Sequence, residues 1–118
     1  MSKKLGSAAM LVAADGTVID PTGARAYNIS GAVVVAVGTT SSAVDAMPTL
    51  GETGEVMVHS DVACAIALGA AGVGPAVMAS TPMRLEAGER FHFRPTSTQT
   101  NFRVIGTSAG VLRLIPVA

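Results

Sequence analysis

The chain has 118 residues, of which 49% are hydrophobic and 14% are charged, and its 8 Lys and Arg residues balance its 8 Asp and Glu residues. This composition excludes a disordered chain, whose signature is low hydrophobicity with high net charge. The absence of net charge also argues against a protein that binds nucleic acid through a basic surface.

The first 23 residues contain many turn signals, including Asp15-Gly16 and Asp20-Pro21-Thr22-Gly23, and their apolar runs are short. They predict an N-terminal arm or peripheral strands over residues 1–23, which would add a strand to a neighbouring subunit. A flexible terminus is an equal alternative. The run from Ala8 to Ala14 is thin for a secretion signal, and the Gly- and Pro-containing stretch from Val62 to Met83 does not suit a membrane span.

From residue 24 to residue 118 the dominant period is two, and Gly, Pro, Asn, Asp and Ser interrupt short apolar runs. This pattern predicts one all-β domain, an antiparallel β-sandwich over residues 24–118. The strands expected along the chain are 8–13, 24–29, 31–37, 41–46, 54–59, 62–68, 76–79, 83–86, 90–94, 101–106 and 111–117.

Two of these runs are apolar on both faces, 31–37 and 62–68. In the second run the larger side chains alternate with Ala63, Ala65 and Ala67. Only one face of a strand meets the core of a two-layer protein, so the other face requires a covering loop, the N-terminal arm or a neighbouring subunit. We expect the three alanines to make subunit contacts, because an alanine face permits close approach; the alternative is that they remain exposed to solvent.

The carboxy-terminal runs alternate most clearly. Phe91 and Phe93 fall on one face of their run, and Leu112 and Leu114 do the same in the last strand, so these four are predicted core residues. The turn Glu86-Ala87-Gly88-Glu89 places Gly where a positive φ is needed, and it predicts that the flanking strands are hairpin or Greek-key neighbours.

Catalytic and metal-binding patterns are weak. His59-Ser60-Asp61 holds the residue types of a hydrolytic triad, but an extended chain sends Ser60 to the opposite face from its two neighbours. His59, His92 and Cys64 have no metal-ligand spacing, and the single cysteine excludes an intrachain disulfide and suits a reducing compartment. We therefore expect no enzyme activity, no cofactor and no metal.

Five of the six arginines lie in the last 35 residues. Arg90, Arg94 and Arg103, together with His92 and Arg113, are predicted to share the outer face of adjacent strands. Such a basic stripe suits an acidic partner surface, so Arg90, Arg94 and Arg103 are candidate subunit or partner contacts. The alternative is an ordinary solvated face.

Three segments carry a resemblance to a known family: Glu55 to Gly69, followed by a Gly/Ala/Pro-rich loop, then Met83 to Phe93, and finally Asn101 to Val117. Together they cover a little over half of the chain. This order resembles the small β-sandwich virion proteins of tailed bacteriophages, in particular head decoration (cement) proteins and related head-associated proteins. The resemblance implies a jelly-roll-like fold without catalysis.

For function, the resemblance implies a structural protein that is made in the host cytoplasm and ends on the capsid surface of the virion. There it would bind the major capsid protein and link neighbouring coat subunits, as a homotrimer or another symmetric oligomer. The alternative is a tail or head-fibre component, or a host-binding module, of a phage virion. Nucleic acid and membrane are not expected partners.

Overall fold

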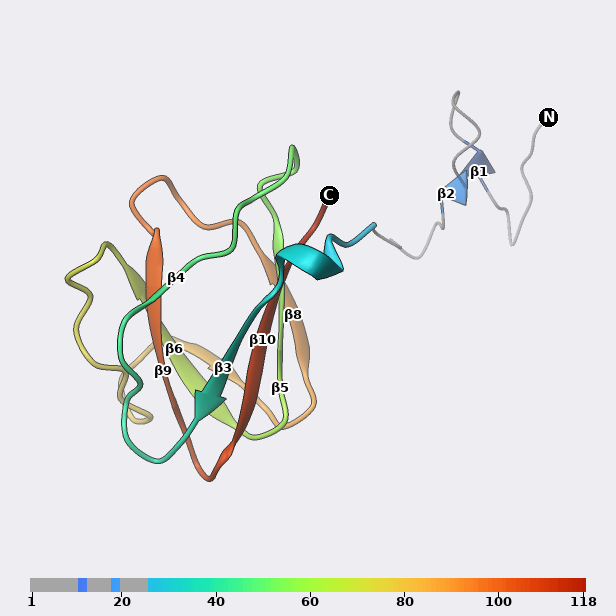
Figure 1. Cartoon of the computed structure of the whole chain (residues 1–118). Helices are drawn as coiled ribbons and strands as arrows, with labels where there is room; N and C mark the ends of the chain where they lie inside the picture. The colour runs from blue at the N-terminus through green and yellow to red at the C-terminus, as the bar shows by residue number, and fades with distance from the viewer. Residues whose placement is uncertain (1–10, 13–17, 20–25) are drawn as a thin grey trace.

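The computed structural model describes residues 11–12, 18–19 and 26–118 (Figure 1). Most of the predicted N-terminal arm, residues 1–23, lies outside these residues. Within it, β1 (Leu11–Val12) and β2 (Val18–Ile19) form an antiparallel pair.

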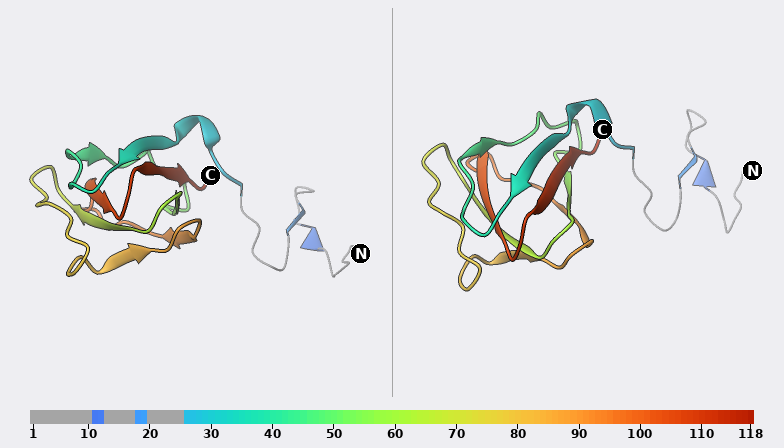
Figure 2. Two further views of the ribbon diagram at one scale, coloured as in Figure 1. Left: turned by 90° about the horizontal axis from the view of Figure 1, so that it is seen from below. Right: turned by 60° about the horizontal axis from the view of Figure 1, so that its bottom comes forward.

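Eight further strands form two four-stranded antiparallel sheets that face each other (Figures 1 and 2). The first sheet has the order β3-β10-β5-β8, with β3 at Val33–Val37, β10 at Gly110–Pro116, β5 at Val56–Ser60 and β8 at Arg90–Phe93. The second sheet has the order β4-β9-β6-β7, with β4 at Asp45–Ala46, β9 at Asn101–Gly106, β6 at Cys64–Gly69 and β7 at Met83–Leu85. The predicted all-β, antiparallel architecture is confirmed.

The core lies between the two sheets and follows the period-two patterns of the central strands. On β9, Phe102 and Val104 are fully buried, and on β10 Leu112 and Leu114 are fully buried. The prediction that Phe91 is a core residue is wrong. Phe91 stays 42% exposed on β8, the edge strand of its sheet, and its ring stacks on that of Phe93 with 6.2 Å between the centroids.

Most connections carry the chain from one sheet to the other. The turn at Glu86–Glu89 leads from β7 in the second sheet to β8 in the first, and β9 and β10 also belong to different sheets. The hairpin alternative for the Glu86–Glu89 turn is therefore wrong, although Gly88 does adopt the expected positive φ of 78°. Among the eight strands of the two sheets, only β6 and β7 are both consecutive and paired.

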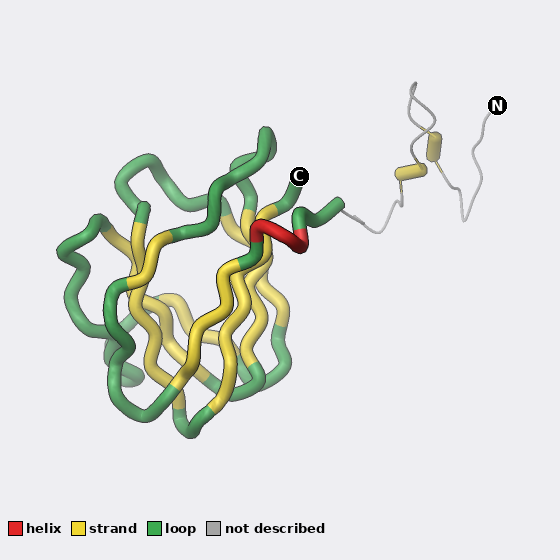
Figure 3. Tube along the Cα trace, in the orientation of Figure 1, coloured by secondary structure: helices red, strands yellow, loops and turns green. Residues whose placement is uncertain are grey.

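Two predicted strands do not form. The predicted strand 24–29 begins outside the described residues, and of residues 26–29 only Tyr27 makes a bridge, an isolated one to Val117. The 3-10 turn η1 (Ile29–Gly31) follows (Figure 3), and its Asn28 cap accepts a side-chain hydrogen bond from the Gly31 amide. In 76–79, the Val77 amide donates to the hydroxyl of Thr81 and the Val77 carbonyl accepts from the Thr81 amide, which closes a turn. Apolar composition alone cannot distinguish such a loop from a strand.

Candidate interaction surface

Part of the outer face of the second sheet is covered by the chain itself. Ala65 on β6 is fully buried, although its neighbours Cys64 and Ile66 are the ones that face the core. Its partners across the sheet are Arg84 on β7 and Ile105 on β9, and these larger side chains share its face. A small residue between large ones loses its accessible surface, so Ala65 is not available to a partner. Ala63 and Ala67 remain half-buried.

Arg103 lies on the same outer face. Its Nε donates to the carbonyl of Ser42 at 2.9 Å and its Nη1 donates to the carbonyl of Val73 at 3.4 Å. The guanidinium therefore ties two loops over the sheet. The loop beyond Val73 is held as well, because the Ala76 amide donates to Ser41 Oγ at 2.9 Å.

The predicted basic stripe is split between the two sheets. Arg90, His92 and Arg113 lie on the first sheet, whereas Arg103 lies on the second. Arg94 follows the last residue of β8 and is exposed. Period-two alternation predicts that each of these side chains lies on an outer face, but the strand order determines which of the two sheets it belongs to.

The outer face of the first sheet carries a row of side chains that are opposite one another on four adjacent strands. Val34 on β3 is opposite Arg113 on β10, Arg113 is opposite His59 on β5, and His59 is opposite Arg90 on β8. The next row places Ile115 opposite Met57. The polar side chains of Arg113, His59 and Arg90 thus lie beside the apolar side chains of Ile115 and Met57.

These rows enclose a shallow depression of about 360 Å³. Its lining consists of Met57, His59, Asp61, Arg90, Arg113 and Ile115. Met57 is only 7% exposed and, with Ile115, supplies the apolar part of the lining. The charged groups are two arginines and one aspartate, so the depression has an excess of positive charge.

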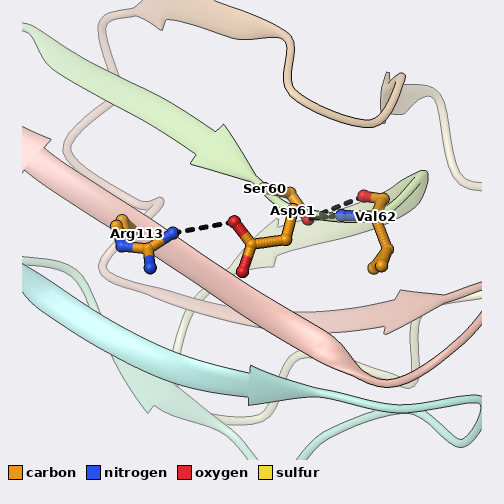
Figure 4. A network of polar contacts seen from close by, with 4 residues as sticks. All are labelled: Ser60, Asp61, Val62 and Arg113. Atoms are coloured by element: carbon orange, nitrogen blue, oxygen red, sulfur yellow. Dashed lines mark hydrogen bonds and ion pairs between the residues drawn. The ribbon is translucent and has the colours of Figure 1, made fainter.

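One ion pair lies in the depression (Figure 4). Arg113 Nη1 donates to Asp61 Oδ1 at 3.1 Å, and both side chains stay partly exposed, at 39% and 45%. Asp61 occupies the turn after β5, where the hydroxyl of Ser60 donates to the Val62 carbonyl at 2.7 Å and accepts from the Val62 amide. Ser60 is fully buried, so it lies apart from the outer-face groups of His59 and Asp61, as the alternation predicts.

Tyr27 contacts His92 across the same sheet. Its hydroxyl lies 2.7 Å from Nε2 of His92, and the two ring centroids are 6.0 Å apart. Tyr27 pairs beside the end of β10 while His92 is on β8, so this contact crosses over β5, the strand that carries Met57.

Large apolar side chains remain exposed on β3 and in the 3-10 turn that precedes it. Ile29 in η1 is 66% exposed, and Val34 on β3 is 61% exposed. The second apolar face of the run 31–37 is therefore uncovered, in contrast to that of 62–68. Sequence alternation identified both runs, but it gave no sign of which one the chain itself would cover.

Cys64 is a buried free thiol. Burial raises its pKa, a hydrogen bond with the Ser60 side chain lowers it, and the charge of Glu89 raises it further. In the described part of the chain, no group of three or more His, Cys, Asp or Glu side chains is arranged to hold a metal ion. The same residues include no helix with the length and hydrophobicity to cross a membrane.

Comparison of the chain with protein-family models, with curated proteins and with solved structures found no match.

Proposed function

We propose that the two sheets form a jelly roll. Counting β3 to β10 as strands one to eight, the sheet orders are 1-8-3-6 and 2-7-4-5, the arrangement that results when a long antiparallel hairpin is rolled into two Greek keys. The crossings between sheets at β7–β8 and β9–β10 fit this order. Jelly rolls are the fold of many viral capsid domains, lectins and cupins.

We propose that the protein is a structural virion protein that decorates the outer capsid of a tailed bacteriophage and links neighbouring coat subunits. The strand order is the observation that carries this proposal, because the three segments of family resemblance form β5 to β10 of the two sheets. The exposed apolar side chains of Ile29 and Val34 also support it, since large apolar side chains left in water are candidates for contact with another protein.

Such a protein acts by binding. A standard interface covers about 1,600 Å², and repetition of even weak contacts over a closed shell adds up to large stabilisation. The low net charge limits repulsion between densely packed copies.

The proposal is tested by mixing the purified protein with capsids of its own phage and sedimenting them. We expect co-sedimentation at a fixed ratio to coat protein and a higher capsid melting temperature. Native mass spectrometry of the free protein is expected to show a trimer or another symmetric oligomer. A monomer that leaves capsids unbound and unstabilised would overturn the proposal.

A host-binding or fibre role is the second candidate. A cavity of about 480 Å³ favours it, because this volume is in the range of small-ligand sites. Its lining combines apolar side chains, such as Leu68 and Met83, with hydrogen-bonding groups of Ser80, Thr81 and Gln99. Saturable binding on a glycan array that a Gln99→Ala variant loses would favour this role over capsid decoration.

A further inference from the structure

We propose that the depression on the outer face of the first sheet is a binding site for a carboxylate, supplied by an acidic side chain of a partner protein. The site consists of Arg90, His59 and Arg113, with Met57 and Ile115 as its apolar floor. The proposal rests on the proposed function only in taking the partner to be a coat subunit.

Strand pairing sets the spacing of the charged groups. Arg113 and Arg90 are both opposite His59, on the strands that flank β5. Neighbouring strands lie about 4.8 Å apart, so the two arginine Cα atoms are separated by about 10 Å. Long guanidinium side chains on the same face of a sheet at this separation can converge on one anion above His59.

The charges of the site are not balanced within the described chain. Among residues 26–118, the Arg90 guanidinium and the His59 ring have no hydrogen-bond or ion-pair partner. Arg113 uses one of its five N–H donors for Asp61. The guanidinium groups of Arg90 and Arg113 face the single carboxylate of Asp61, and one added carboxylate balances the second guanidinium.

The apolar surroundings favour an acidic peptide over a free inorganic anion. Met57 and Ile115 offer a surface for the methylene groups of a Glu side chain. Val34, which is opposite Arg113 on the neighbouring strand, is 61% exposed. A ligand in which Glu is next to an apolar residue would cover both the charged row and Val34. Nucleic acid fits less well, because the chain has no net positive charge to attract a phosphate backbone.

The test measures fluorescence anisotropy of a short labelled peptide in which Glu alternates with Leu, against the same peptide with Gln in place of Glu. The isolated full chain is used, so the result does not depend on whether capsids bind. We expect Arg90→Gln and Arg113→Gln each to weaken binding of the Glu peptide about tenfold, because a hydrogen bond between charged groups is lost. The Gln peptide lacks the carboxylates. We therefore expect its affinity for the parent protein to be no higher than the affinity of the Glu peptide for the Arg90→Gln and Arg113→Gln variants.

Two further variants make the test specific. Arg84→Gln removes the same charge from the outer face of the second sheet and is expected to leave the affinity unchanged. Asp61→Asn removes the carboxylate that competes for Arg113, and it is expected to tighten binding severalfold. The inference is overturned if the Glu peptide does not bind, if Arg84→Gln weakens binding as much as Arg90→Gln, or if a single-stranded oligonucleotide binds more tightly than the peptide.

Discussion

The Tyr27 hydroxyl lies 2.7 Å from Nε2 of His92, although 65 positions separate the two residues in the chain. The contact joins the segment that enters the first sheet to β8, the edge strand on the far side of that sheet. The Asn28 amide donates a hydrogen bond to the carbonyl of Pro116, the last residue of β10, and the Ala118 amide donates to the carbonyl of Ala26. The entering segment is therefore held at several points.

Replacement of Tyr27 by Phe keeps the ring and removes the hydroxyl. We expect Tyr27→Phe to lower the free energy of unfolding by about 0.5–1.5 kcal/mol, the usual net contribution of one hydrogen bond. Urea denaturation followed by circular dichroism measures the change. An unchanged midpoint would mean that water replaces the hydroxyl at His92 without cost.

The aromatic side chains of the core and of the edge strand are expected to differ in their contribution to stability. Phe102 on β9 is fully buried between the sheets, so Phe102→Ala should cost about 3–5 kcal/mol. Phe91 on the edge strand β8 is 42% exposed, and Phe91→Ala should cost clearly less because less apolar surface leaves water on folding. Equal losses of unfolding free energy for the two variants, measured by urea denaturation, would contradict the partial exposure of Phe91.

The sequence predicts individual strands better than it predicts their partners. β9 forms over the predicted residues 101–106 because alternate side chains there meet one core, and the strand is bounded by Asn101 and Gly106. Sheet membership depends instead on pairing between distant segments. For this reason the predicted basic stripe divides, with Arg90 on one sheet and Arg103 on the other.

The candidate surface was likewise only partly predictable. Alternation places Arg90 and Arg113 on outer faces, but their positions on either side of His59 follow from the order β10-β5-β8. The burial of Ala65 follows from the size of its cross-strand neighbours, Arg84 and Ile105, which local sequence does not reveal. Val34 stays exposed because its neighbours on β3, Val33 and Val35, face the core while its own face has no cover.

Gly51 is expected to be a sensitive glycine despite its exposure. A Cβ added there would lie 2.6 Å from the Val117 carbonyl oxygen and 2.9 Å from the Ala118 carbonyl carbon, both of them backbone atoms. Because the backbone must shift to admit the methyl group, we expect Gly51→Ala to cost about 1–3 kcal/mol. A Cβ on Gly38 would meet no atom within 4 Å, and Gly38→Ala is the matched control, with an expected effect near zero. Thermal melts of both variants check the difference, and equal melting temperatures would contradict the close approach at Gly51.

The buried thiol of Cys64 is expected to make stability fall at alkaline pH. Burial raises the pKa of Cys64 above its ordinary value of 9.0, so above that pH the unfolded chain releases a proton that the folded chain retains. The contribution of the thiol to stability is therefore complete below pH 9.0 and is lost as pH rises through the folded pKa.

The measurement is the free energy of unfolding at a series of pH values between 7 and 11, for the parent protein and for Cys64→Ala. Cys64→Ala loses core contacts at every pH but has no thiol to titrate, so its stability is expected to fall less steeply above pH 9.0. Other groups that titrate in this range are common to both proteins and cancel in the comparison. Parallel curves would contradict the effect of burial on the thiol, and so would rapid alkylation of the native protein by iodoacetamide, because a fully buried thiol reacts only when the chain opens.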